Sequence, residues 1–128
     1  MQALALAQVA AVSAGASLGA LLRWRAGAWL DAQWHGIPLA TLAVNCSGGL
    51  AVGAAMVWFG RNPNELLRLL LVTGMLGGLT TFSTFSAESL ALLQSGRLVS
   101  ALLHSLLHVL GALGCAAVGF HFGRLLMD

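Results

Sequence analysis

The residues best suited to bind an ion fall within one ten-residue stretch of an otherwise apolar segment. Residues 77–86 read GGLTTFSTFS and combine two adjacent glycines, five hydroxyl side chains and two phenylalanines. Glycine's backbone freedom and hydroxyls that compete for backbone hydrogen bonds both weaken a helix. A helix that breaks here frees carbonyl oxygens, which suit a hard cation such as Na⁺. We therefore predict a break near Gly77–Thr81, where the backbone lines water or is buried in protein.

Phe82 and Phe85 follow the predicted break three residues apart and therefore share a helix face. An aromatic ring has a negative face and a positive edge, so that rings presented edge-on can attract an anion. Ordinary aromatic packing is the alternative interpretation. Pure packing is the less convincing of the two because hydroxyl residues surround the rings, namely Thr81, Ser83, Thr84 and Ser86.

Three further polar residues lie in or beside apolar runs. Asn45 is near the middle of the second run, where an unpaired amide is costly, so it needs a partner on another helix or a ligand. Glu88 is the one carboxylate well inside a run, and an intramembrane ionisable group is a functional candidate. A vestibule position or a salt bridge to an arginine are alternatives for Glu88. Arg23 ends the first run, from which it can snorkel to the membrane interface.

His104 and His108 are four residues apart in the last apolar run and share a helix face. Such a pair can supply two metal ligands, but a metal needs a third or fourth ligand. No further ligand is evident at a suitable spacing. A polar stripe that lines a pore or contacts a helix is therefore the preferred interpretation.

Composition identifies lipid as the solvent in which these residues must be positioned. Of 128 residues, 59% are hydrophobic and 8% are charged, against about 25% charged in a typical soluble domain. The basic residues are sparse and all arginine, which does not suit nucleic-acid binding. No catalytic constellation is present, so we do not expect an enzyme.

Four apolar runs, each long enough to cross a membrane as a helix, predict an all-α membrane protein with a single four-span domain. Short polar connections, the first at residues 31–36, make successive helices antiparallel. The predicted spans are residues 3–22, 38–59, 66–93 and 98–122.

The arginines do not favour either orientation in the membrane. Four spans place three arginines on one side (Arg61, Arg68, Arg124) and three on the other (Arg23, Arg25, Arg97). Because Lys/Arg asymmetry sets orientation, this balance predicts dual topology and an antiparallel homodimer. One arginine that dominates by its position would instead give a single orientation. Glycine pairs at four-residue spacing predict close helix packing, without indicating which belong to a dimer: Gly15/Gly19, Gly49/Gly53, Gly74/Gly78 and Gly119/Gly123.

The run GGLTTFSTF, with Glu88 following, resembles the signature of the Fluc (CrcB) family of small fluoride channels. The runs GASLGALLR and TLAVNCSGGLAVG resemble that family's first and second spans. The resemblance covers all four spans and is most specific in the third. It implies a passive, fluoride-selective channel that exports cytoplasmic fluoride across the cell (inner) membrane. It also implies a lipid-embedded antiparallel homodimer with two pores.

The resemblance further implies roles for individual residues. A structural Na⁺ at the dimer centre would be held by the backbone carbonyls of Gly77 and Thr80 from both subunits. Fluoride would contact the ring edges of Phe82 and Phe85. The other implied pore residues are Asn45 as a donor, Glu88 near a pore end, Arg23 near the entrance, and Thr81, Ser83 and Thr84 as pore-lining or helix-bridging hydroxyls. In the fourth span, His104 and His108, with Ser105 nearby, occupy the stripe where the family tends to place hydroxyl residues, and their pore role stays open.

Two other functions compete with a channel. A small multidrug-type proton-coupled exporter also has four spans, but it needs a buried carboxylate in its first span. Residues 3–22 contain none, and Glu88 lies late in the third span. A structural or assembly membrane protein is the third possibility. It does not require a hydroxyl-rich break in a helix.

Overall fold

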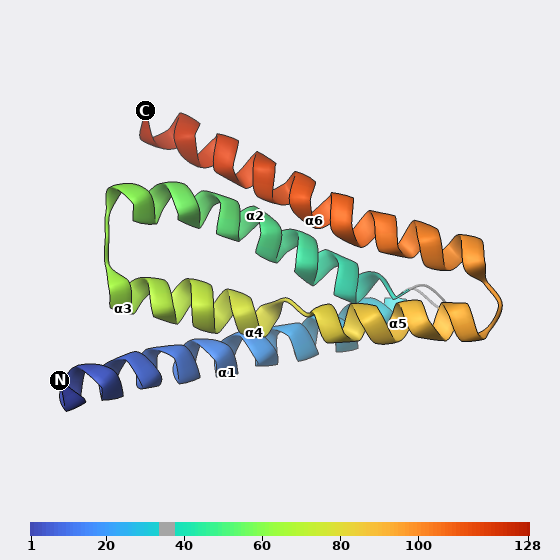
Figure 1. Cartoon of the computed structure of the whole chain (residues 1–128), viewed down its shortest axis with the longest axis horizontal. Helices are drawn as coiled ribbons and strands as arrows, with labels where there is room; N and C mark the ends of the chain where they lie inside the picture. The colour runs from blue at the N-terminus through green and yellow to red at the C-terminus, as the bar shows by residue number, and fades with distance from the viewer. Residues whose placement is uncertain (34–37) are drawn as a thin grey trace.

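The computed structural model describes residues 1–33 and 38–128, which form an all-helical bundle (Figure 1). Four helical stretches are long and apolar enough to cross a membrane, namely Gln2–Leu30, Leu39–Arg61, Glu65–Gln94 and Leu98–Met127. The elements are α1 (Gln2–Gln33), α2 (Leu39–Arg61), α3 (Glu65–Arg68), the π-helical η1 (Leu69–Leu76), α4 (Gly77–Leu79), α5 (Phe82–Gln94) and α6 (Leu98–Met127). The predicted all-α architecture with four candidate spans is therefore confirmed.

The helices extend beyond the apolar runs that predicted them. The first run ends at Leu22, whereas α1 continues to Gln33, so residues 31–33 of the predicted connection are helical. The remainder of that connection, residues 34–36, lies outside the described residues. The extension contains neither proline nor a run of residues that disfavour helix, so the helical hydrogen bonding continues past Arg23 and Arg25. Similarly, α6 continues past Phe122 to Met127.

Glycines bring the helices together in two close pairs. A Cβ added at Gly53 or Gly119 would overlap a backbone carbonyl across the α2–α6 contact. Gly15 and Gly19 of α1 lie equally close to the backbone of η1 and α4. Figure 1 shows α6 along α2, and α1 along the third span. The predicted glycine pairs are thus used for packing within one chain, where removal of side chains lets backbones meet.

The third span breaks at Thr80 and Thr81, at the end of the predicted interval. Thr80 (ψ 154°) and Thr81 (φ −149°, ψ 118°) are extended, whereas Gly77 keeps helical angles (φ −63°, ψ −36°). Thr81 Oγ1 accepts a hydrogen bond from the Thr84 N–H at 3.2 Å and so caps α5. The hydroxyl residues therefore end the helix. Gly78 serves close packing instead, since a Cβ there would meet the carbonyl of Ala16.

Both termini and the α2–α3 turn lie at one end of the bundle (Figure 1). At this end Arg61 donates hydrogen bonds to the Met127 carbonyl and the Asp128 carboxylate. The hydrogen bond from Arg61 lowers the pKa of Asp128 from its ordinary value. Arg68 pairs with Glu65 three residues earlier, at 3.0 Å. The Arg61 contacts join the end of α2 to the C-terminus, and the Arg68–Glu65 pair lies within α3, at the start of the third span.

Candidate functional site

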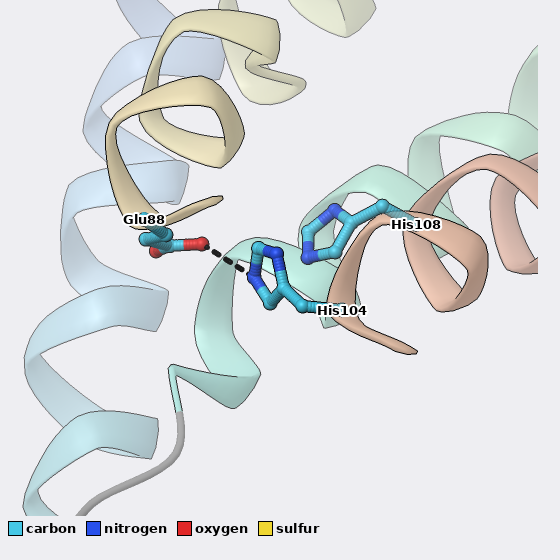
Figure 2. A group of neighbouring side chains, drawn as sticks. All are labelled: Glu88, His104 and His108. Atoms are coloured by element: carbon cyan, nitrogen blue, oxygen red, sulfur yellow. Dashed lines mark hydrogen bonds and ion pairs between the residues drawn. The ribbon is translucent and has the colours of Figure 1, made fainter. Parts of the chain in front are cut away.

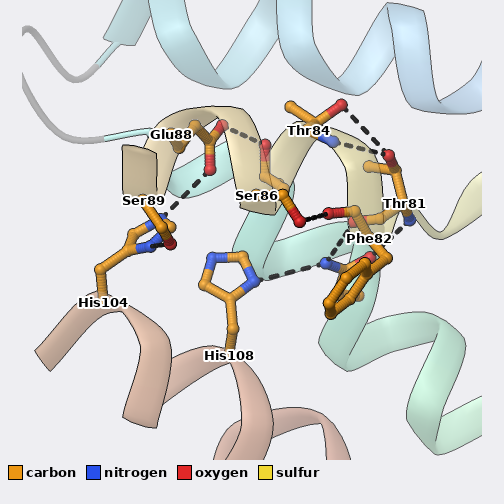
Figure 3. A network of polar contacts seen from close by, with 10 residues as sticks. Thr81, Phe82, Thr84, Ser86, Glu88, Ser89, His104 and His108 are labelled. Carbon is orange, nitrogen blue, oxygen red and sulfur yellow. Dashed lines mark hydrogen bonds and ion pairs between the residues drawn. The ribbon is translucent and has the colours of Figure 1, made fainter. Parts of the chain in front are cut away.

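Asn45 on α2 holds the break in the third span. Its Oδ1 accepts a hydrogen bond from the Thr81 N–H at 2.8 Å, and its Nδ2 donates to the Thr81 carbonyl at 3.1 Å. Because both backbone groups of Thr81 are engaged, the amide has one orientation. Nδ2 also lies 3.3 Å from His108 Nδ1. The polar network of Figure 3 therefore joins α2, the break and α6. The partner predicted for Asn45 is therefore the backbone of Thr81, at the break in the third span.

The break frees the two carbonyls expected to bind a cation. In a continuous helix, Gly77 C=O would accept from the Thr81 N–H and Thr80 C=O from the Thr84 N–H. Here the Thr81 N–H donates to Asn45 and the Thr84 N–H donates to Thr81 Oγ1. In the described part of the chain neither carbonyl receives its helical donor. Carbonyl oxygens on non-helical backbone suit a hard cation such as Na⁺, so these residues fit that ion.

After the break, Phe82 packs on Phe85, and Phe85 packs on the histidines of α6. The ring centroids of Phe82 and Phe85 lie 5.3 Å apart and tilted by 54°. Phe85 lies 4.8 Å from His108 and is nearly parallel to His104 at 5.5 Å. Phe82 is 77% exposed at the edge of the same group. Both rings line a cavity of about 560 Å³ that Asn45 and His108 also line.

Glu88 and the histidines form a second polar group on α5 and α6 (Figure 2). Thr41 Oγ1 donates to Glu88 Oε1 at 2.6 Å, and His104 Nε2 lies 3.1 Å from Glu88 Oε2. His104 Nδ1 lies 3.0 Å from Ser89 Oγ. The alternative of an arginine partner for Glu88 is therefore not observed among the described residues, because Thr41 and His104 take its oxygens. The contribution of Ser89 was not predicted, since nothing in its local sequence distinguishes it from the other serines.

A second cavity places Arg23 beside this group. Arg23, Thr41, Thr81, Thr84 and Glu88 line a space of about 600 Å³. Gly77 and Thr80 line the cavity of Phe82 and Phe85, while Thr81 lines both spaces. The structure thus gathers most of the predicted residues around Thr81. Ser83 is the exception: it is exposed, lines neither cavity, and its hydroxyl lies 3.1 Å from Thr81 Oγ1.

Two cavities meet at the broken helix of this four-span bundle. Hydrogen-bond donors, aromatic rings and one arginine border them. This arrangement defines a small ion-conducting membrane protein. The sequence profile of the family described as "CrcB-like protein, Camphor Resistance (CrcB)" matches residues 10–120. The chain therefore belongs to the CrcB family, as its resemblance to that family predicted.

Curated relatives agree with this assignment. The chain is 51% identical over 112 residues to the "Fluoride-specific ion channel FluC" of Aromatoleum aromaticum, with 86% of each chain covered. It is 47% identical over 114 residues to the protein of that name from Marinobacter nauticus, covering 88% of this chain and 90% of the relative. The corresponding protein of Pseudomonas syringae pv. maculicola is 48% identical over 110 residues. The family is one of ion channels and not of enzymes, and these matches do not favour the multidrug-type exporter.

Proposed function

We propose that this protein is a passive, fluoride-selective channel that exports cytoplasmic fluoride across the cell (inner) membrane. The clamp of Asn45 on Thr81 carries this proposal, because it fixes an amide donor at the cavity lined by Phe82 and Phe85. Fluoride is small and strongly hydrated, so a pore must replace its water with donors and positive ring edges. It must do so without binding the ion too tightly to release it. The names of the relatives support fluoride as that ion.

Each part of the site has a task in this mechanism. Arg23 attracts anions into the cavity that it shares with Glu88. Thr41 and His104 engage the Glu88 carboxylate, which limits its repulsion of an incoming anion. Beyond Thr81, the ion meets the phenylalanine rings and takes the Asn45 N–H that otherwise faces His108 Nδ1. Transport needs no ATP: acid outside drives HF entry, the cytoplasm re-ionises it, and trapped fluoride leaves down its gradient.

We further propose that the working unit is an antiparallel homodimer with two pores and a central Na⁺. The equal distribution of arginines supports insertion in both orientations. The exposed Phe82 and the cavity bordered by Gly77 and Thr80 give a second subunit a surface to cover. Two freed carbonyls from each of two subunits would give the cation four oxygen ligands. Lipid would cover the remaining exposed apolar side chains.

Liposomes that contain the purified protein should release fluoride passively and reject chloride. When vesicles loaded with potassium fluoride receive a K⁺ ionophore, the opposing voltage is removed and fluoride should appear at an external electrode. Vesicles loaded with chloride should release almost none under the same conditions. Protein-free vesicles are the control. Equal chloride release, or no fluoride release, would contradict a fluoride channel.

Dual topology should make half of the copies accessible from each side of the membrane. Gln94 is exposed at the end of α5, so a cysteine placed there can react with a membrane-impermeant maleimide. In intact cells we expect labelling of about half of the Gln94→Cys protein, and of nearly all after permeabilisation. The unsubstituted protein, with Cys46 and Cys115 in its spans, controls for background. Complete or absent labelling in intact cells would show a single orientation.

Removal of Na⁺ should weaken the dimer. Replacement of Na⁺ by N-methylglucamine leaves the freed carbonyls of Gly77 and Thr80 facing one another without a cation. We expect faster subunit exchange, measured by energy transfer between two separately labelled populations. K⁺ at the same ionic strength is the control for ion specificity. An exchange rate that is the same in all three salts would contradict a structural Na⁺ site.

A further inference from the structure

We propose that Glu88, His104 and His108 form a binding site for a divalent transition-metal ion such as Zn²⁺, and that its occupancy blocks the conducting path. Two imidazoles and one carboxylate are ligands that zinc takes in proteins, with a fourth position left for water. The sequence offered only the two histidines. The fold brings Glu88 of α5 to them as the third ligand (Figure 2).

The geometry is close to that of a metal site. One ligand atom from each of the three residues can be chosen so that all lie within 4.8 Å of one another. His104 Nε2 and Glu88 Oε2 are already 3.1 Å apart, and the two imidazole centroids are 4.4 Å apart. A tetrahedral zinc with bonds of about 2.0–2.1 Å holds its ligand atoms roughly 3.3 Å apart. Small side-chain rotations would therefore close the site around an ion.

A buried nitrogen without a partner points to a missing ligand. His108 is 4% exposed, and its Nε2 is buried without a hydrogen-bond partner among the described residues. An unsatisfied polar atom of this kind is costly and calls for an explanation. The contact of His104 Nδ1 with Ser89 Oγ also resembles the outer contacts that orient metal-binding histidines. A metal would give His108 Nε2 a partner, and it would bind His104 in the orientation that Ser89 already holds.

Metal binding would act on the pore through Asn45. Because Thr81 fixes the Asn45 amide, Nδ2 presents an N–H to His108 Nδ1, which must accept it. Neutral His108 then carries its proton on Nε2. A metal on Nε2 displaces that proton, and Nδ1 takes up another, so the imidazole stays neutral. Two N–H groups would then face each other, which separates His108 from Asn45.

The ion can reach the site from either cavity, since Glu88 lines one and His108 lines the other. Arg23 lines the cavity of Glu88 and opposes the approach of a cation. The single carboxylate of the site offsets that charge. Metal binding does not depend on fluoride transport, whereas the block rests on the proposed function. The two can therefore be tested apart.

Binding is tested on purified protein in detergent. Zn²⁺ is titrated in competition with a chromophoric chelator, and Co²⁺ by its visible absorption. We expect one ion per chain and the intense absorption of tetrahedral Co²⁺. The variants His104→Gln, His108→Gln and Glu88→Gln should each bind at least about tenfold more weakly. His121→Gln is the matched control, because His121 is exposed on the same helix. Gel filtration checks that each variant folds.

Block is tested by fluoride efflux with and without external Zn²⁺, expressed as the ratio of the two rates within each variant. Zinc should lower the ratio for the unsubstituted protein and for His121→Gln, and leave it near one for His108→Gln. Affinities equal to the unsubstituted protein in the three site variants would overturn the metal site. Binding without inhibition would overturn the coupling to Asn45. Absence of fluoride efflux before zinc is added would instead overturn the proposed function.

Discussion

Replacing Phe85 by alanine should reduce fluoride efflux from proteoliposomes at least about tenfold, equivalent to about 1.4 kcal/mol in the barrier to the ion. Phe85 contacts the rings of Phe82, His104 and His108. Its loss therefore removes one ring edge from the cavity and also leaves these three rings without a packing partner. Phe82→Ala should reduce efflux only through the loss of its own ring edge, because Phe82 is more exposed. The measurement is initial fluoride efflux at equal protein density.

Phe122→Ala is the matched control for both aromatic variants. Phe122 is exposed on α6 and lines neither cavity around Thr81, so its removal should leave efflux unchanged. Gel filtration should show that all three variants keep the elution volume of the unsubstituted protein. Unchanged efflux in both Phe82→Ala and Phe85→Ala would remove the rings from the permeation mechanism.

Replacing Asn45 by leucine should both destabilise the protein and abolish fluoride efflux. Leucine has a similar size but leaves the Thr81 N–H and carbonyl without their partners in a buried position. Each unsatisfied backbone group costs about 1–3 kcal/mol, so we expect a loss of about 2–6 kcal/mol in the free energy of unfolding. Unfolding by SDS in mixed micelles, followed by circular dichroism, measures this loss.

Two further variants separate stability from permeation at Asn45. Asn45→Asp keeps an acceptor for the Thr81 N–H but loses the donor and adds a negative charge. Its carboxylate would face the Thr81 carbonyl and repel an incoming anion, so this variant should fail to pass fluoride although the Thr81 N–H keeps an acceptor. Ser47→Ala is the control on the same helix, because the Ser47 hydroxyl donates to the Ala43 carbonyl of its own helix. Normal efflux through Asn45→Leu would show that this amide neither supports the break nor meets the ion.

The central position of Thr81 gives these experiments a common basis. Its hydroxyl caps α5, its backbone binds Asn45, and it lines both cavities. The same residue thus ends one helical segment, starts the next and separates Arg23 from the phenylalanine rings. Interactions at this point are coupled, so effects of neighbouring substitutions should not simply add.

Local sequence was sufficient for the architecture and for the existence of the break. Hydrophobic runs long enough to span a bilayer must become helices, because lipid offers no partners for an open backbone. The hydroxyl-rich stretch after Gly77–Gly78 indicated where such a helix would fail. The position within that stretch was less well predicted. Thr80 and Thr81 break the helix, since a threonine side chain can replace a backbone partner, whereas Gly77 keeps helical angles and Gly78 packs against α1.

The tertiary structure alone decided which polar residues meet. Asn45 contacts Thr81 and His108 across 36 and 63 residues of sequence, and Glu88 reaches His104 across 16. Helical spacing relates residues only within one helix, so it placed Asn45, Glu88 and the histidines on faces without indicating which faces oppose each other. The approach of α5 to α6, and of α2 to both, placed the Glu88 carboxylate beside His104 and His108. It also supplied the amide that holds the break open.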